Sequence, residues 1–333
     1  MTMSLDRSTL LEHLLGAIDR DELTLPVLPE VATRLNELLH DPNVSAREVT
    51  AVISGDVAIS AHLLKVANSA AFADKPKVEQ MPQAISRLGY LQVHNLVTQF
   101  AVSNMLKTSN PVINQYLQDF WVRSREVAAL SHALTKVNRQ LNADQAMFAG
   151  IIHDIGILPM CLYIDQQRAN LTPAELDELA ARCKRSISLK LLHAWNFPDT
   201  MLAVVSEEYR SGDEGNYGDI VKVASLLQRG EIEQTDWDGL EAAQRLGLDE
   251  FTCRNFMVKF AGHIKFARGL LGMKTQEEGI AEPTPTNQAA PVAPGAVQGA
   301  AVTGSAQPPV IEETAEQPRE KGFLSGLFKG FRG

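Results

Sequence analysis

The residues best suited to chemistry lie in one short segment, Ala149-Gly150-Ile151-Ile152-His153-Asp154-Ile155-Gly156. A histidine followed directly by an aspartate, at the end of an apolar helical turn, can offer an imidazole nitrogen and a carboxylate oxygen to one metal ion. The plainer alternative is a helix-terminal histidine hydrogen-bonded to its neighbour. Two adjacent ligands do not make a catalytic site, because a catalytic metal needs about three protein ligands and an open water position. No Cys or Ser has an evident base at motif spacing, so a nucleophilic enzyme is not indicated.

The elements that must position this segment are predicted to be helical. Ser45 with Glu48, and Thr172 with Glu175, form capping boxes that mark two helix starts. Apolar residues recur with helical spacing from Val57 to Ala67 and from Leu91 to Leu106. Strand signals are weak, because no long apolar–polar alternation lies beside a hairpin turn. The sequence therefore predicts an all-α fold, an irregular bundle of short helices.

Two loop positions carry a backbone prediction, and a third residue carries a capping prediction. Gly89, between two predicted helices, is expected to have a positive φ. Asn68 ends the helix that starts near Val57, and Asn tolerates a left-handed conformation at such an end. Asp56 is expected to cap the same helix at its beginning.

Composition limits the class of protein. The chain has 333 residues, of which 45% are apolar and 21% charged, as in ordinary globular proteins. The formal charge of −9 disfavours an electrostatic grip on nucleic-acid phosphates, and no nucleic acid is expected as a partner. Three widely spaced cysteines, Cys161, Cys183 and Cys253, predict buried thiols in a reducing compartment. Without an export signal near the start or an uninterrupted apolar span, we expect a cytoplasmic protein.

Composition changes near Lys274. Residues 275–318 contain seven prolines and no aromatic residue, which predicts a disordered linker. The final segment, 319–333, carries a net charge of +3 and predicts a basic amphipathic helix with one apolar face, formed by Phe323, Leu324, Leu327, Phe328 and Phe331. Such a segment suits peripheral contact with the inner membrane face or docking in a groove of a partner protein.

Several segments together resemble the HDOD domain, a helical relative of the HD superfamily of metal-dependent phosphohydrolases found in bacterial signalling proteins. They are LPVLPEVATRLNELLHDPNVSAREVTAVISGDVAISAHLLKVANSAAF from Leu25, then QAISRLGYLQVHNLV, AGIIHDIGIL and HAWNFPDTM. The resemblance covers about residues 20–230, in the expected order. It implies an N-terminal helical lobe over 1–108 and an HD-like lobe with further helices over 109–274.

The resemblance also implies where metal ligands would lie in an active HD enzyme. Besides His153 and Asp154, such enzymes use an upstream His, a later Asp and, for two metals, further histidines. The corresponding positions here hold Arg123, Lys184, Glu208 and Ser225. A guanidinium cannot coordinate a cation, and a hydroxyl is a poor substitute for a carboxylate. Residues that could still supply ligands from unexpected directions are His132, His193, Glu207 and Asp219.

We therefore expect a catalytically silent, HDOD-type regulatory module with no metal and no cofactor, which binds signalling proteins of unknown identity. One alternative is a metal-dependent HD-type phosphohydrolase or phosphodiesterase acting on a nucleotide. Another is a pseudoenzyme that binds a nucleotide as a sensor, without turnover, in the pocket that holds the metal site of active HD enzymes. Arg87 and Asn68 are further candidates for contact with a ligand or partner. The Arg87 guanidinium can bind a phosphate or carboxylate through two parallel hydrogen bonds.

Overall fold

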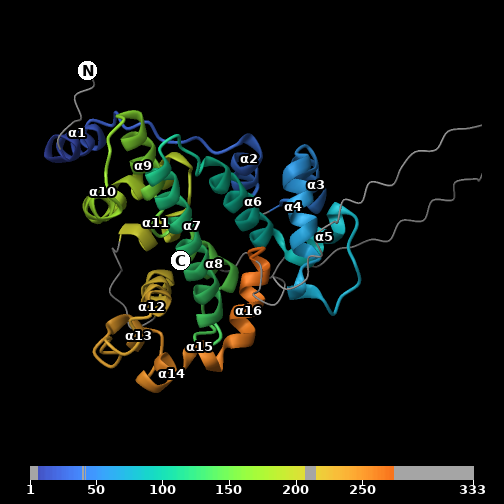
Figure 1. Ribbon diagram of the computed structural model, residues 1–333. Coiled ribbons are helices and arrows are strands. Elements are labelled where there is room, and N and C mark those ends of the chain that lie inside the picture. The colour runs from blue at the N-terminus through green and yellow to red at the C-terminus, as the bar shows by residue number, and fades with distance from the viewer. Residues whose placement is uncertain (1–6, 40, 42, 207–214, 274–333) are drawn as a thin grey trace, which may run out of the picture. The chain divides into compact units, whose positions relative to one another are not determined.

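The computed structural model describes residues 7–39, 41, 43–206 and 215–273, and every regular element in these residues is a helix (Figure 1). The all-α prediction is confirmed. The elements of the first half are α1 (Arg7–Asp19), α2 (Glu30–Leu39), α3 (Ala46–Ser54), α4 (Val57–Ala67), the 3-10 helix η1 (Ala70–Phe72), α5 (Met81–Leu88) and α6 (Tyr90–Met105). The predicted linker over 275–318 and tail over 319–333 lie outside the described residues.

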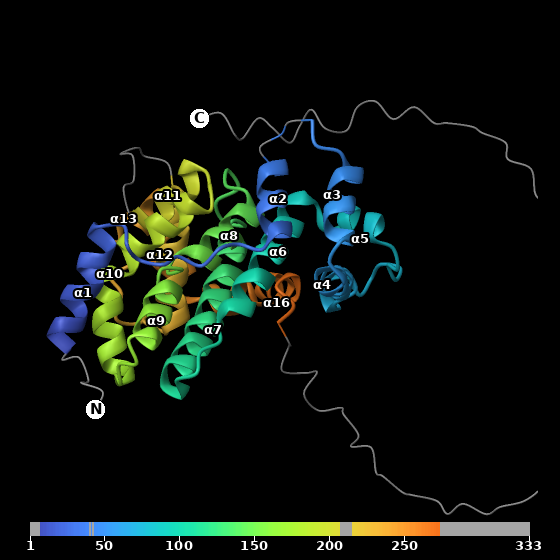
Figure 2. The same cartoon turned by 90° about the horizontal axis from the view of Figure 1, so that it is seen from above.

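The second half begins with the longest helix, α7 (Pro111–Leu134). The elements that follow are α8 (Ala143–Ile152), α9 (Ile157–Gln166), α10 (Pro173–Ala194), α11 (Asp199–Ser206), α12 (Tyr217–Arg229), α13 (Glu241–Arg245), α14 (Glu250–Arg254), α15 (Phe256–Lys259) and α16 (Ala261–Leu270). Helices α8, α12 and α16 all pack against α7, which runs through the middle of the views in Figures 1 and 2. Helix α16 also contacts α4 and η1, so it joins the early helices to α7.

The helix ends follow the local signals in the sequence. Ser45 and Thr172 each form the predicted capping box, and Asp56 accepts hydrogen bonds from the backbone at the start of α4. Gly89 has the expected positive φ, 83°. The left-handed conformation expected for Asn68 is wrong: its φ is −109°, and its side chain is bonded to the backbone of Val78 across the loop that follows α4.

The core continues along the chain from α1 to α16 and includes the three cysteine thiols, whose predicted burial is confirmed. Burial raises the pKa of each of these thiols. One stretch, Ala143–Gln166, is long and apolar enough to cross a membrane by length and composition. Most of it is buried in the fold, where it forms two helices, α8 and α9, on either side of the His153–Asp154 turn.

Candidate functional site around His153 and Asp154

Two glycines fix the segment that carries His153 and Asp154. A Cβ on Gly150 would lie 2.5 Å from the Ala128 Cα, so α8 approaches the α7 backbone more closely there than any larger residue allows. A Cβ on Gly156 would lie 2.1 Å from the Lys184 carbonyl oxygen, and the Gly156 N–H donates to Ser188 Oγ at 2.8 Å. The turn after α8 is therefore pressed onto the α10 backbone.

At this turn the side chains of α8 and α10 meet. His153 caps the C-terminus of α8, and its Nδ1 lies 2.8 Å from the Gly150 carbonyl oxygen. Its Nε2 lies 3.7 Å from an Asp154 carboxylate oxygen. The Lys184 ammonium, from α10, donates to the Asp154 carboxylate at 2.7 Å. The side chains of His153, Asp154 and Lys184 are 15%, 24% and 37% exposed, so the cluster is mostly enclosed.

The charges around Asp154 determine its protonation. Burial would raise the pKa of the Asp154 carboxyl, but the neighbouring His153, Lys184 and Arg123 outweigh burial and hold that pKa below its ordinary value. Arg123 is exposed on α7. The Asp154 carboxylate is thus already paired with a protein cation, the directly bonded Lys184 ammonium.

The sequence matches the HDOD domain family over residues 25–211, more than half of the chain. The chain belongs to the HDOD family. The expectation drawn from the sequence segments is thereby confirmed. The HDOD match includes the His153–Asp154 turn and its partners Arg123 and Lys184.

Solved structures share the HDOD fold. A protein from Shewanella amazonensis SB2B, whose name places it provisionally among metal-dependent phosphohydrolases, is 27% identical, with a TM-score of 0.65 over 80% of this chain and 98% of its own. An HDOD domain protein of unknown function from Geobacter sulfurreducens is 17% identical, with a TM-score of 0.54 over 79% of this chain and 98% of its own. At that identity the second likeness shows the fold alone.

A curated relative, an uncharacterised protein from Treponema pallidum (strain Nichols), is 24% identical over 196 residues. The match covers 54% of this chain and 37% of the relative, so the chain spans less than half the length of that protein.

Among the described residues, the donor set at the His153–Asp154 turn, here called the HD turn, does not fit a divalent metal. Within the part of the chain that the structure describes, no group of three or more His, Cys, Asp or Glu side chains is placed to hold a metal ion. The Lys184 ammonium lies where it neutralises the Asp154 carboxylate, and an ammonium has no lone pair to offer a metal. Ser225 lies half-buried on α12. Glu208, the remaining replaced position, and Glu207 lie outside the described residues.

The other residues considered as ligands have different roles. Asp219 is buried, completes the capping box at the start of α12 and pairs with Arg245 at 2.6 Å. His132 is buried on α7 with its ring 6.0 Å from that of Phe266. His193 is exposed near the end of α10. None of these three joins His153 and Asp154 in a described hydrogen bond or ion pair.

Arg87 and Asn68 both hold the connection between α4 and α5. Arg87 donates to the carbonyl oxygens of Ala67 and Pro76. The Asn68 amide donates to the Val78 carbonyl at 2.7 Å and accepts from the Val78 N–H at 2.8 Å. These bonds give both residues a structural role at the base of the loop.

The contact that sequence reasoning missed is the bond between Lys184 and Asp154. The sequence analysis placed Lys184 at one of the replaced ligand positions but did not identify it as a direct partner of Asp154. Their positions differ by 30 residues, and the bond depends on the close approach of Gly156 to the α10 backbone. A lysine at a position where the family resemblance implies a metal ligand was the available signal.

Proposed function

We propose that this HDOD protein is a non-catalytic signalling module, which acts by binding other proteins and does not hydrolyse phosphoesters. The observation that carries the proposal is the 2.7 Å bond between the Lys184 ammonium and the Asp154 carboxylate. In a catalytic HD site a metal ion would provide the positive charge that this carboxylate needs. Here a side chain provides it, so the carboxylate needs no metal.

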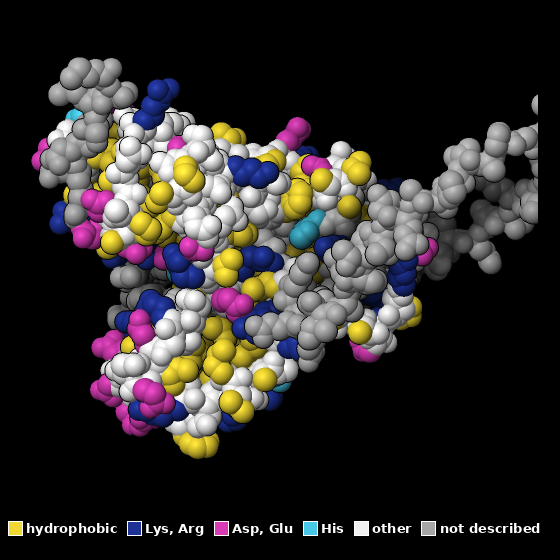
Figure 3. All heavy atoms as spheres, in the orientation of Figure 1, with side chains coloured by type: hydrophobic (Ala, Val, Ile, Leu, Met, Phe, Trp, Pro, Cys, Tyr) yellow, Lys and Arg dark blue, Asp and Glu magenta, His cyan; other side chains and the backbone are white. Residues whose placement is uncertain are grey.

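The charge around the turn supports the same proposal. Lys and Arg side chains lie across the middle of the face in Figure 3, with some acidic side chains among them, whereas acidic side chains gather at the lower left, where Figure 1 places α13 and α14. Against the effect of burial, His153, Lys184 and Arg123 together lower the pKa of Asp154. A divalent cation would have to displace one positive charge and approach another, which is unfavourable in a half-enclosed site.

The first experiment tests catalysis directly. We expect full-length protein, purified after growth with added iron, manganese and zinc, to carry less than about a tenth of an equivalent of metal, because three or more ligands are needed to retain one. We also expect no hydrolysis of bis(p-nitrophenyl) phosphate with added Mn²⁺. Near-stoichiometric metal together with hydrolysis, both lost in His153→Ala, would overturn the proposal.

A matched gain-of-ligand variant makes a negative result informative. Arg123→His, Lys184→His and Ser225→Asp together place imidazole or carboxylate at three positions where the family resemblance expects ligands. We expect this triple variant to bind Mn²⁺ more tightly than the wild type in a calorimetric titration, because borderline metals prefer these donors. Arg123→Lys with Lys184→Arg is the control, since it changes the same helices and adds no ligand.

The proposal extends to the C-terminal segment, whose placement lies outside the described residues. Its five apolar side chains and net charge of +3 suit a peripheral membrane surface or a partner groove. A pull-down with the full-length chain and with a chain truncated at Lys274, read by mass spectrometry and repeated with the candidate partner tagged, tests this role. A protein that binds the full-length and truncated chains equally, both in the pull-down and in the repeat with the partner tagged, would show that the HDOD domain recognises it and that the tail does not.

A further inference from the structure

Helix α16 lies outside the stretch that matches the HDOD family, which ends at residue 211. It nevertheless packs against α7, α4 and η1, all of which belong to that stretch. The surface of α4, η1, α6 and α7 that contacts or bonds α16 is here called the α16 seat. The HDOD domain therefore holds, in this seat, a helix that follows the family match in the chain.

Side chains of the seat bond the C-terminal end of α16. The last carbonyls of a helix have no N–H partner within it, so other groups must supply the donors. Gln92 of α6 donates to Leu270 O at 3.1 Å. Gln99 of α6 and Arg125 of α7 donate to Leu271 O at 3.1 and 2.8 Å. The seat thus carries three donors placed to receive the end of a helix.

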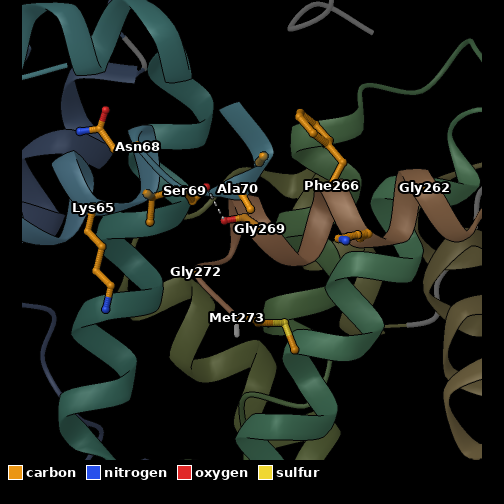
Figure 4. A pocket seen from close by; sticks show the side chains of 12 residues that line it. Lys65, Asn68, Ser69, Ala70, Gly262, Phe266, Gly269, Gly272 and Met273 are labelled. Carbon is orange, nitrogen blue, oxygen red and sulfur yellow. Dashed lines mark hydrogen bonds between the residues drawn. The ribbon is translucent and has the colours of Figure 1, made fainter. Parts of the chain in front are cut away.

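Two further contacts fix the position of α16 along its seat. Arg268 pairs with Glu126 of α7, and two guanidinium nitrogens lie 3.0 and 2.8 Å from the same carboxylate oxygen. Ser69 Oγ donates to the Gly269 carbonyl at 3.4 Å (Figure 4). An added Cβ on Gly269 would lie 2.9 Å from the Ala71 Cβ of η1. A residue larger than glycine does not fit at this point unless η1 moves.

The polar groups of the seat are not all used by α16. Within the described part of the chain, four buried atoms beside its C-terminal end have no hydrogen-bond partner: Gln92 Oε1, Gln99 Oε1, Arg125 Nε and His62 Nε2. His62 faces the turn after α16, since an added Cβ on Gly272 would lie 3.8 Å from its Cε1. Buried polar atoms without partners destabilise the seated arrangement, and release of α16 would expose them to water.

The packing of α16 is also looser than that of the core helices. Four of its ten residues are buried, against seven of ten in α8. A cavity of about 450 Å³ lies between α16 and the α4–η1 connection, and Phe266 and Met273 are among the residues that line it (Figure 4). Segments with few buried contacts open locally at a lower free energy than the core does.

We propose that α16 is a displaceable helix and that its seat is a binding site for a helix of a partner protein. The partner helix has the chemistry of α16 itself: a glycine opposite Ala71, an arginine next to it for Glu126, and free carbonyls at its C-terminal end. In the resting protein α16 fills the seat, and its release leaves the seat to the partner. The inference rests on the proposed function, because it names a surface through which the module binds a protein.

The probe for this site is a fluorescently labelled peptide of residues 256–273, whose binding to full-length protein is measured by anisotropy. Gly269→Ala in the protein should raise the apparent affinity of the peptide at least about tenfold, because it pushes the protein's own α16 away from Ala71 and increases the fraction of vacant seats. Gly262→Ala is the matched control on the same helix. An added Cβ there meets nothing within 4 Å, so the affinity should not rise.

The same substitution in the peptide tests whether the seat recognises the helix. A peptide with Gly269→Ala should bind the Gly269→Ala protein at least about tenfold more weakly than the unchanged peptide, since it meets Ala71 in the same way. A circular dichroism melt shows that the variant protein folds. The proposal is overturned if the unchanged peptide binds the Gly269→Ala and Gly262→Ala proteins equally, or if the two peptides bind equally.

Hydrogen exchange of the full-length wild-type protein gives a second readout that needs no variant. If α16 leaves its seat as a unit, its amides should exchange together and at least about tenfold faster than those of α8, a helix of the same length. One common rate for both helices would show that α16 opens only with the whole domain, which contradicts the proposal. The metal and hydrolysis assays do not involve α16, so the absence of catalysis stands or falls separately.

Discussion

Replacement of Lys184 by Met is the sharpest test of the charge balance at the HD turn. The substitution keeps a side chain of similar length and removes the ammonium 2.7 Å from the Asp154 carboxylate. Removing one partner of a buried ion pair costs about 3–5 kcal/mol, whereas exposed pairs contribute less than about 1 kcal/mol. Because Lys184 is 37% exposed and Asp154 24%, solvent screening reduces the effect, and we expect a loss of about 1–2 kcal/mol at pH 7.

The sign of the pH dependence follows from the lowered pKa of Asp154. A carboxyl whose pKa is lower in the folded than in the unfolded state contributes stability above the unfolded pKa, and that stability is lost as the pH falls through the folded pKa. Lys184→Met removes one cause of the lowering, so its penalty should shrink from pH 7 towards about pH 4, as the carboxyl of the variant takes up a proton.

Urea unfolding followed by circular dichroism at both pH values measures this penalty. Lys190→Met is the matched control on the same helix, since its partner Asp21 is 81% exposed and the pair lies 2.8 Å apart at the surface. We expect less than about 0.5 kcal/mol there. The reasoning fails if the two variants lose equal stability, or if the Lys184→Met penalty is the same at both pH values.

Three other predictions test the packing at Gly156, the buried imidazole of His132 and the C-terminal tail. Gly156→Ala should cost more than about 3 kcal/mol, whereas Gly262→Ala, whose added Cβ meets nothing within 4 Å, should be neutral or stabilise by up to about 1 kcal/mol; equal urea midpoints would contradict the close α10 contact. Burial and, to a smaller extent, nearby positive charge lower the pKa of His132 to about 4. The unfolded state therefore takes up a proton before the folded state does, and stability should fall as the pH drops below about 6.5. Between pH 7 and 5, urea unfolding should show the wild type losing about 2 kcal/mol more than His132→Leu; the same loss in both would place the titration elsewhere. A peptide of residues 319–333 should gain helical circular dichroism with anionic vesicles or an identified partner, and Phe328→Glu should abolish the gain; if the two peptides behave alike, docking by the apolar face is wrong.

Local signals predicted local structure well. The caps at Ser45 and Thr172 and the positive φ of Gly89 each depend on residues within a few positions of one another, and all were confirmed. Asn68 shows where such reasoning ends. Its side chain is bonded to Val78, ten positions away, and no local pattern favours that partner over solvent. The Asp154–Lys184 bond was still harder to predict from local signals, since it requires the turn after α8 to meet α10 at Gly156.

The same dependence explains why an HD dipeptide alone says little about catalysis. His153 and Asp154 are held by contacts that involve no metal: one with the Gly150 carbonyl, and one with the Lys184 ammonium. A partly buried carboxylate must be neutralised by some cation, and the fold places that cation on α10. A mobile metal could be exchanged or could activate water, but an ammonium on a helix can do neither. Under the proposed function, the turn serves as a joint between α8 and α10, and recognition falls to surfaces elsewhere on the chain.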